Sequence, residues 1–471
     1  MNNPWARQSN AVMLFKLLGL ASAAVTAGLA ILWTGEIATI WMRMIFIVLI
    51  VSVPLLAALM RYRLEFSELA HFFALSFGIF YVIPLAYALL IGDPLIESNA
   101  FPEAMNYLII GGVCFYAAYY SGFGKTAATL FPNIARYSFG RLKFRMILYL
   151  FLSIATASFV FVIVRSGGFL FYISNLGERV IFWENLGYLW WGVLLVIPSS
   201  WAYYGYLVET RGKAHVGFWI FLGLVLLFLL SLGSRWNIIS LSFGLLIVHH
   251  HAARRVRIHH LILLALVLLV FSFLYQFYRN YLSIEHYMNV YQQGNLAQRF
   301  IFGSLGGFNS LVVVLEGVPE IMDFQYGRSL VDLVYYPIPR LLWPAKPELT
   351  AMGFSQTFFP EAAAAGVIQG IPYLGELYLN FGPLGITVGM MVLGFFCRSL
   401  YAYVRLNGFN TASLLIYVCS IEPLMRGMRG GLFAFLTHFL MNLIPVVIIL
   451  VFSAEQRAKV KPRSVGRIAP L

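Results

Sequence analysis

The sequence predicts an all-α polytopic membrane protein. Of its 471 residues 61% are hydrophobic and only 11% are charged, and the mean hydropathy is +0.81. A soluble domain is roughly 45–50% apolar and about a quarter charged, so this chain cannot cover a water-facing surface. Its apolar residues form continuous runs of Leu, Ile, Val and Phe. Because these runs do not alternate with polar residues, an outer-membrane barrel is excluded.

Run length predicts about twelve transmembrane helices in a single membrane domain that covers residues 1–471. A helix needs about 20 apolar residues to cross roughly 30 Å of hydrocarbon. In chain order the predicted spans are 11–34, 39–60, 69–91, 105–121, 146–165, 187–208, 216–233, 237–250, 259–275, 372–397, 410–422 and 431–453. The two shortest, 237–250 and 410–422, either fall short of a crossing or extend into their neighbours. A cleaved signal peptide at the first run is the alternative there, but that run is long for one.

The distribution of charge predicts the orientation. With a cytoplasmic N-terminus, alternate loops place 21 of the 32 basic residues on one side, together with only four of the 19 acidic residues. This is the positive-inside asymmetry, and it puts both termini in the cytoplasm. The asymmetry also accounts for the net charge of +13 without a nucleic-acid partner.

One long segment, 276–371, falls on the outer side. Loops longer than about 15 residues are usually functional or disordered. This one is rich in Tyr, Phe, Leu, Gly and Pro, with a stiff Pro-aromatic centre at Tyr335–Arg340 and Trp343–Pro347. We expect short interfacial or re-entrant helices at 299–317 and 325–336, packed over the bundle.

The outer side carries arginine almost to the exclusion of lysine, although the positive-inside rule predicts few bases there. Arginine presents a planar fork of donors that matches phosphate oxygens. Each arginine either reaches lipid headgroups or pairs with a carboxylate such as Glu178, Glu184, Asp332 or Glu376, or several of them together bind an anionic phosphate. Glycines beside three of them, Arg235, Arg426 and Arg429, favour the phosphate site, because glycine leaves helix-end N–H groups accessible to an anion. The arginines at the outer ends of apolar runs are Arg165, Arg235, Arg279, Arg299, Arg328, Arg340, Arg426 and Arg429.

A second candidate group surrounds Glu376. This residue lies about one turn inside the outer end of the span at 372–397, and Tyr373 and Asn380 share its helix face. The carboxylate is either half of an ion pair or a base that removes a proton from a hydroxyl, and the sequence leaves both open. We expect His438 to be a hydrogen-bonded core residue, while His286 in the outer loop is an equal candidate for a base.

The sequence predicts no metal site and no other cofactor. It contains only three aspartates, Asp93, Asp323 and Asp332, so no D-x-D pair exists to hold a divalent cation against a diphosphate. Arginine would then neutralise any phosphate charge. The histidines of 249–251 and 259–260 share a loop with three arginines and are expected to be a solvated topological anchor. The three cysteines have no metal-binding or disulfide spacing.

Three blocks, Gly233–Arg235, Gly327–Pro347 and Gly375–Gly382, resemble the Wzy-type oligosaccharide repeat-unit polymerases, which are the O-antigen and capsule polymerases of bacterial inner membranes. The resemblance implies a GT-C-like, metal-independent glycosyltransferase at the periplasmic face. Its donor and acceptor would be undecaprenyl-diphosphate-linked oligosaccharides, and its product a lipopolysaccharide O-antigen, a capsule or an exopolysaccharide. A chain-length regulator is a further implied partner.

The resemblance also implies roles for the candidate residues. Arg235, Arg426 and Arg429 would bind the diphosphate, and Glu376, beside Asn380, would be the base for the acceptor hydroxyl. The remaining candidates would shape the outer-loop half of the site or stack on sugar rings: Arg279, Arg328, Arg340, Tyr335, Tyr336, Trp343 and Tyr373. Rival interpretations are a lipid-linked oligosaccharide flippase or transport channel, an O-antigen ligase, and a structural membrane subunit. Long outer loops and the lack of paired halves disfavour a flippase.

Overall fold

The computed structural model describes residues 37–60, 65–134, 137–176, 182–183, 186–281, 296–340, 342–364 and 368–456. Within these ranges the chain is helical, apart from an antiparallel ribbon of β1 (Tyr137–Phe139) and β2 (Ala454–Gln456). The predicted all-α class is therefore confirmed. The predicted first span at 11–34 lies outside the described residues, as does the part of the outer loop at 282–295.

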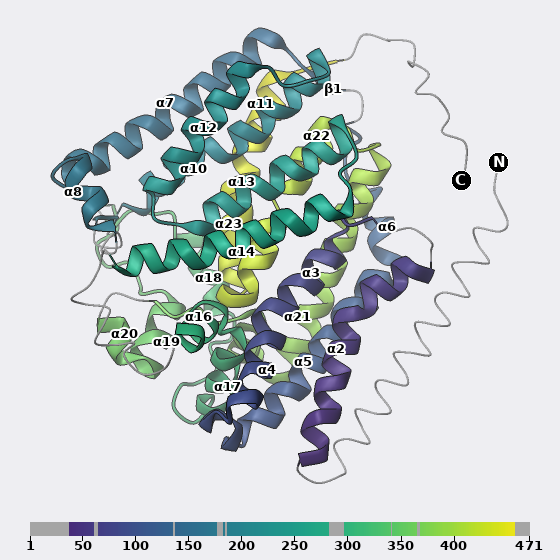
Figure 1. Ribbon diagram of the computed structural model, residues 1–471, viewed down its shortest axis with the longest axis vertical. Coiled ribbons are helices and arrows are strands. Elements are labelled where there is room, and N and C mark those ends of the chain that lie inside the picture. Colours follow the sequence, from purple (N-terminus) through teal and green to yellow (C-terminus); the bar gives the residue numbers. More distant parts are fainter. Residues whose placement is uncertain are drawn as a thin grey trace.

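The helices form one bundle, with the short helices of residues 296–364 in the lower half of Figure 1. The elements up to residue 281 are α2 (Ile37–Met60), α3 (Leu69–Phe77), η1 (Gly78–Val82), α4 (Ile83–Ile91), η2 (Pro94–Glu97), α5 (Ala100–Tyr120), α6 (Phe123–Ala128), α7 (Arg141–Arg165), α8 (Phe169–Ser174), α10 (Gly187–Leu194), α11 (Val196–Arg211), α12 (Val216–Ser231), α13 (Arg235–Val248), η4 (His249–Ala253) and α14 (Ile258–Tyr281). Those after it are α16 (Leu296–Leu305), α17 (Gly307–Gly317), α18 (Arg328–Tyr335), α19 (Thr350–Phe358), α20 (Pro360–Ala364), α21 (Tyr373–Leu406), α22 (Thr411–Val418) and α23 (Ile421–Ser453).

Every predicted span within the described residues coincides with a helix or with consecutive helices. Five helical stretches are long and apolar enough to cross a membrane: Thr39–Met60, Leu69–Ile91, Arg141–Arg165, Tyr373–Leu406 and Thr411–Ser453. Others, such as α12, are apolar but shorter. The chain is thus a helical membrane protein, while the count of twelve crossings and the GT-C-like arrangement remain predictions.

Two of the long helices are interrupted. In α21 the helical geometry fails at Phe381 and Gly382, where φ of the glycine is 61°, and in α23 it fails at Gly431, where φ is 77°. Only glycine adopts these angles without a steric penalty, and Pro383 prevents the helix from continuing through the first break. The predicted span 372–397 is consequently two helical pieces, whereas the predicted start of the last span at residue 431 falls on the second break.

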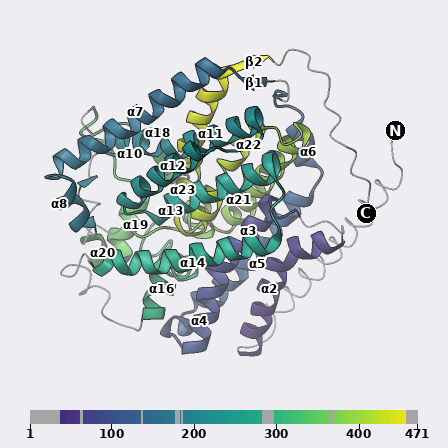
Figure 2. The same ribbon diagram turned by 45° about the horizontal axis from the view of Figure 1, so that its top comes forward.

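Loops predicted to share a side of the membrane do lie at the same end of the bundle. At one end the ribbon pairs Tyr137–Phe139 with Ala454–Gln456, and Asn407 accepts a hydrogen bond from the backbone of Ile134 at 2.9 Å. Both strands lie together at the top of Figure 2. At the other end Arg429 donates to the carbonyl of Gly303 at 2.8 Å. We call these the inner and outer ends, after the predicted orientation, which itself remains a prediction.

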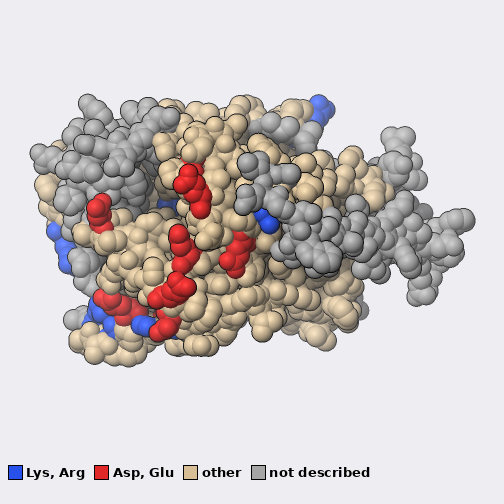
Figure 3. All heavy atoms as spheres, turned by 90° about the horizontal axis from the view of Figure 1, so that it is seen from below, with Lys and Arg blue, Asp and Glu red and all other residues tan. Residues whose placement is uncertain are grey.

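The outer end is acidic, as the charge distribution predicts. Seen from below, Asp and Glu side chains run across this face (Figure 3). The described acidic residues between α4 and the first turn of α5, and from the end of α17 onward, include Asp93, Glu97, Glu103, Glu316, Glu320 and Asp323.

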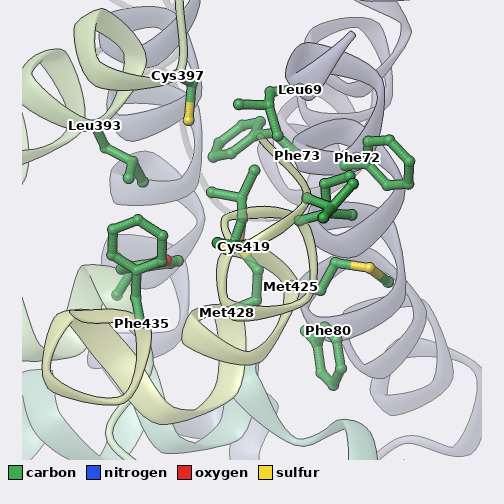
Figure 4. Close-up of a cluster of buried hydrophobic side chains, with 14 of the residues drawn as sticks. Leu69, Phe72, Phe73, Phe80, Leu393, Cys397, Cys419, Met425, Met428 and Phe435 are labelled. Carbon is green, nitrogen blue, oxygen red and sulfur yellow. The ribbon is translucent and has the colours of Figure 1, made fainter. Parts of the chain in front are cut away.

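The core lies between α3, α21 and the C-terminal helices. Leu69 and Phe73 of α3 lie on one side of this core and Leu393 and Cys397 of α21 on the other, with Cys419 and, from α23, Met428 between them (Figure 4). Glycines bring these helices close together. A Cβ on Gly394 of α21 would lie 2.2 Å from the carbonyl oxygen of Phe115 in α5. Small residues at such contacts are typical of membrane helices, whose association depends on close packing rather than on hydrophobic transfer.

The outer segment is built from short helices, as predicted. The expected helix 299–317 is two helices, α16 and α17, divided at Gly306, and the expected helix 325–336 is α18. Helices α19 and α20 were not predicted. Buried Phe308 of α17 packs edge-on against Phe101 of α5, with ring centroids 5.2 Å apart. This segment is therefore part of the packed outer end.

Candidate functional site

The centre of the candidate site is the contact between the start of α18 and the first piece of α21. Ser329 donates a hydrogen bond to Oε1 of Glu376 at 2.6 Å. The amide of Asn380 donates to Ser329 Oγ at 2.8 Å and accepts from the backbone N–H of Gly327 at 2.9 Å. All three side chains are buried. The predicted shared face of Glu376 and Asn380 is confirmed, since Asn380 also donates to the backbone carbonyl of Glu376.

The break in α23 supplies the other partners of Glu376. The backbone N–H of Phe433 lies 3.3 Å from Oε1 and 3.1 Å from Oε2, and the N–H of Leu432 donates as well. These groups are the free N–H groups of the helical piece that begins after Gly431, so the carboxylate caps that piece from a neighbouring helix. We call Ser329, Glu376, Asn380, Gly431 and Phe433 the outer junction.

Glu376 is 3% exposed and is held by donors from two other elements. Among the described residues the ion pairs are Arg398–Glu68 and Arg426–Glu422, so the structure gives Glu376 hydrogen-bond donors rather than an arginine partner. Such a carboxylate fixes the relative position of the elements that donate to it. A role as a base remains a proposal, because a substrate hydroxyl would have to take the place of one of these donors.

No residue with a side chain fits at position 431. A Cβ there would lie 2.0 Å from Oε2 of Glu376, and its φ of 77° with ψ of −169° is a conformation that side chains rarely adopt. We expect Gly431→Ala to abolish the wild-type activity and to lower the unfolding temperature of the purified protein. Gly353→Ala in α19 is the matched control, because a Cβ there meets nothing within 4 Å and is expected to change neither measurement. A fully active, equally stable Gly431→Ala protein would contradict this geometry of the junction.

Asp332 connects α18 to the segment that follows it. It is 2% exposed, accepts a hydrogen bond from the hydroxyl of Tyr335, and accepts another from the backbone N–H of Thr350 at 2.6 Å. Burial, together with the bond to Asp332, raises the pKa of Tyr335 to about 12. The tyrosine therefore stays protonated and acts as a donor at neutral pH.

Arg426 lies on the first piece of α23, just before the break. Its Nε is 2.6 Å from Oε1 of Glu422, one helical turn earlier, and its guanidinium lies over the ring of Trp236 at 5.1 Å from the centroid. The guanidinium also acts electrostatically on Tyr336, where it opposes the rise in pKa that burial of the phenol causes. Tyr336 in turn packs edge-on against Phe433, with centroids 5.4 Å apart. Arg426 is thereby linked through two aromatic rings to the outer junction.

The other two predicted phosphate ligands, Arg429 and Arg235, each contact a backbone carbonyl of another helix. Arg429 is two residues from Gly431 and donates to the carbonyl of Gly303 in α16 at 2.8 Å. Arg235 begins α13, next to Trp236, and its Nη1 lies 3.4 Å from the carbonyl of Ser272 in α14. The two predicted phosphate ligands Arg426 and Arg429 thus both lie on the piece of α23 that ends at the break at Gly431, while Arg235 is next in sequence to Trp236, over whose ring Arg426 lies.

The remaining predicted residues form the rim. Arg328 and Arg340 are exposed, and Nη1 of Arg340 donates to the carbonyl of Lys346 at 3.0 Å. Trp343 is 39% exposed and packs edge-on to Tyr335. Lys346 donates to the carbonyls of Tyr336 and Ile338, which folds the Pro-rich chain back on itself. Arg279 lies in the last turn of α14, but its side chain is outside the described residues.

Tyr373 does not lie where a sugar-stacking residue is needed. It is 1% exposed, and a Cβ on Gly427 would lie 2.2 Å from its ring. The residue therefore fills the contact between α21 and α23, because it points into the space that the glycine leaves. His438, expected in the core, bonds the carbonyl of Ala434 through Nδ1 at 2.9 Å.

Several residues of the site were not singled out from sequence. Ser329, Gly431 and Phe433 act through contacts between segments far apart in the chain, and no local pattern marks them. Glu422 could have been predicted from the sequence, because it precedes Arg426 by four residues, which is the spacing of an ion pair on one helix face. Asp332 was expected as a partner for arginine, and it bonds Tyr335 and Thr350 instead.

Part of the chain is similar to known proteins. Over 85 residues, 17% of this chain, it is 41% identical to the O-antigen polymerase of Salmonella typhimurium (strain LT2), and the O-antigen polymerase of Salmonella typhi matches to the same extent. The match spans about a fifth of the length of these curated relatives, 20% of each. No family model matches the chain, and no solved structure matches it. The similarity supports a relationship to O-antigen polymerases.

Proposed function

We propose that this protein is a bacterial polysaccharide polymerase that joins oligosaccharide repeat units carried on undecaprenyl diphosphate. The observation that carries the proposal is the 85-residue match to O-antigen polymerases. It is supported by arginines at the outer end of a helical membrane protein, a place where bases are otherwise rare. The reaction takes place at the periplasmic face of the inner membrane, where the predicted orientation puts this end.

In the proposed reaction a hydroxyl of one lipid-linked repeat unit attacks the anomeric carbon of the glycan on a second lipid. A new carbon–oxygen bond forms as the bond from the anomeric carbon to the diphosphate breaks. The hydroxyl loses its proton, and undecaprenyl diphosphate leaves with the negative charge. Because the donor linkage is already activated, no nucleotide is consumed.

The growing charge on the leaving diphosphate requires fixed positive groups. Arg426 and Arg429 meet this need, with Arg235 beside them, because their elements are held in place by the outer junction and by Trp236. Preorganised donors that bind the transition state more tightly than the substrate account for a large share of enzymatic rate enhancement. The rim residues Arg279, Arg328, Arg340, Tyr336 and Trp343 would then contact the glycans.

Glu376 has two proposed roles that lead to different results. As a positioning residue, it holds α18 and the second piece of α23 so that Arg426 and Arg429 face the diphosphate. As a base, it accepts the proton of the acceptor hydroxyl after the substrate displaces Ser329. The present hydrogen bonds support the first role.

The direct test is incubation of the purified protein with one defined lipid-diphosphate repeat unit. We expect a ladder of products, and we expect it to persist when EDTA is present and no nucleotide is added. Absence of any product longer than the input in folded preparations of the protein would overturn the polymerase proposal. A ladder that EDTA removes would overturn its metal independence.

Cells separate the rival functions. Loss of a polymerase leaves single repeat units on the surface, loss of a flippase leaves no exported glycan, and loss of an O-antigen ligase leaves polymer attached to its lipid carrier. We expect a deletion strain to show the first pattern on gels of surface glycan. Either of the other patterns would contradict the proposal.

A further inference from the structure

A second polar site lies at the inner end, away from the outer junction. A cavity of about 690 Å³ opens between the first turns of α7, the last turns of α11 and the start of α12. Its lining comes from all three elements and combines basic, aromatic and aliphatic side chains. A volume of this size is typical of sites that hold a small molecule.

The cavity is strongly basic. Arg141 and Arg145 are one helical turn apart on α7, and Arg211 comes from the last turn of α11. None of the lining residues is acidic. Within the described part of the chain, none of these three arginines makes an ion pair or a hydrogen bond. Their charges are left to be neutralised by something outside this chain.

Other polar groups of the lining also suit an anion. Arg145 of α7 and Arg211 of α11 both line the cavity together with Tyr203, so two guanidinium groups reach it from different helices. His215 closes the cavity from α12, with Nδ1 accepting from the N–H of Phe218 at 3.1 Å.

The deeper wall is apolar. Phe144, Leu148 and Leu152 of α7 face Phe221 of α12 across the cavity. On both sides of its mouth the helices expose large apolar side chains, including Leu142 at 72% and Ile220 at 62%, which are surfaces that suit lipid chains. A ligand that fits must therefore join an anionic group to hydrocarbon.

We propose that this cavity binds an anionic phospholipid of the inner leaflet, with its phosphate between Arg145, Arg211 and Arg141 and its acyl chains along α7 and α12. Basic pockets between membrane helices on the cytoplasmic side commonly bind such headgroups. The site is independent of the proposed polymerase reaction, whose residues lie at the other end of the bundle. By contacting α7, α11 and the start of α12 together, the lipid would hold these helices to one another at the inner end.

The test is a titration of the purified full-length protein in detergent with dioleoylphosphatidylglycerol, with dioleoylphosphatidylcholine as the zwitterionic comparison, read by native mass spectrometry. We expect clear preference for phosphatidylglycerol. Arg145→Gln with Arg211→Gln should weaken its binding about 30-fold, since each basic group near a lipid phosphate contributes about 1 kcal/mol, which is about a fivefold factor in affinity. The matched control is Lys143→Gln with Lys213→Gln, which removes two exposed charges at the same end that do not line the cavity. The control should bind as the wild type does.

Further measurements distinguish a lipid ligand from a free anion. Millimolar inorganic phosphate should leave phosphatidylglycerol bound, because the apolar wall contributes to binding; displacement by phosphate would overturn the lipid assignment. Equal binding of phosphatidylcholine, or equal weakening by the pocket and control variants, would overturn the site itself. The single variants Arg145→Gln and Arg211→Gln replace the double variant if it fails to fold, and each should weaken binding several-fold.

Discussion

Replacing Glu376 by Gln is expected to reduce polymer formation about 100-fold or more while the protein remains folded and inserted. The hydrogen-bond partners of the carboxylate are all donors: the hydroxyl of Ser329 and the backbone N–H groups of Leu432 and Phe433. A glutamine amide keeps one acceptor oxygen and adds an NH2 group, so at least one donor loses its partner. The measurements are the length distribution of surface glycan and the rate of the purified enzyme.

The pH dependence of the remaining activity distinguishes the two roles of Glu376. If the carboxylate is a base, Glu376→Gln removes one limb of the pH–rate profile; if it is a positioning residue, the rate falls at every pH and the shape is kept. Glu361→Gln, at an exposed site on α20, is the control and should be unchanged. Wild-type chain length in Glu376→Gln would exclude both roles.

Glu376→Ala is expected to have a larger effect on folding than Glu376→Gln. It leaves the same donors unsatisfied in a buried place and opens a gap beside the break at Gly431, which together cost about 2–4 kcal/mol of stability. We expect a large drop in the unfolding temperature of Glu376→Ala and only a small drop for Glu376→Gln. This difference would separate loss of structure from loss of function.

Arg426→Lys and Arg429→Lys are each expected to lower the polymerisation rate about 100-fold with insertion intact. Lysine keeps the positive charge but loses the planar fork of donors, so it cannot bind diphosphate oxygens in pairs. In Arg426→Lys the stacking on Trp236 is also weakened. The rate constant of polymerisation should fall by a larger factor than the apparent affinity for the donor. The reason is that the interaction between arginine and diphosphate strengthens as the diphosphate departs.

The control for the arginine variants is Arg43→Lys. Arg43 is a base of α2 that bonds Asn106 at 3.0 Å and is not part of the outer junction or its neighbours. We expect less than about a twofold change there, since it has no contact with a charge that develops in the reaction. Normal chain length in both Arg426→Lys and Arg429→Lys would remove the proposed diphosphate site, even if the protein polymerises glycan by other residues.

The positions of the helices follow closely from the sequence. The apolar runs that predict spans at 39–60 and 146–165 correspond to α2 and α7, and the predicted start of the last span at residue 431 coincides with the break in α23. These features are local, because a continuous apolar run in a membrane satisfies its backbone only as a helix. The break after Phe381 was missed, although Gly382–Pro383 carries the signal for it.

The candidate site was predictable in part. Glu376 with Asn380 and the pair of Arg426 and Arg429 stood out from composition and spacing. Their partners did not: Ser329 lies 47 residues from Glu376 in sequence, and Phe433 lies 57 residues away. For Tyr373 the sequence-based prediction was wrong: it was expected to stack on a sugar ring, but it is a buried core residue.

The sequence by itself determined the class of the protein, the placement of its apolar helices and the surplus of arginine on the predicted outer side. All of these depend on the transfer of side chains between water and lipid, which each segment undergoes on its own. Only the tertiary structure decided that Glu376 caps a broken helix, that Arg426 lies on Trp236, and that Arg145 and Arg211 approach one cavity from two helices. Those arrangements depend on how separate helices pack, and local sequence patterns do not specify distances between them.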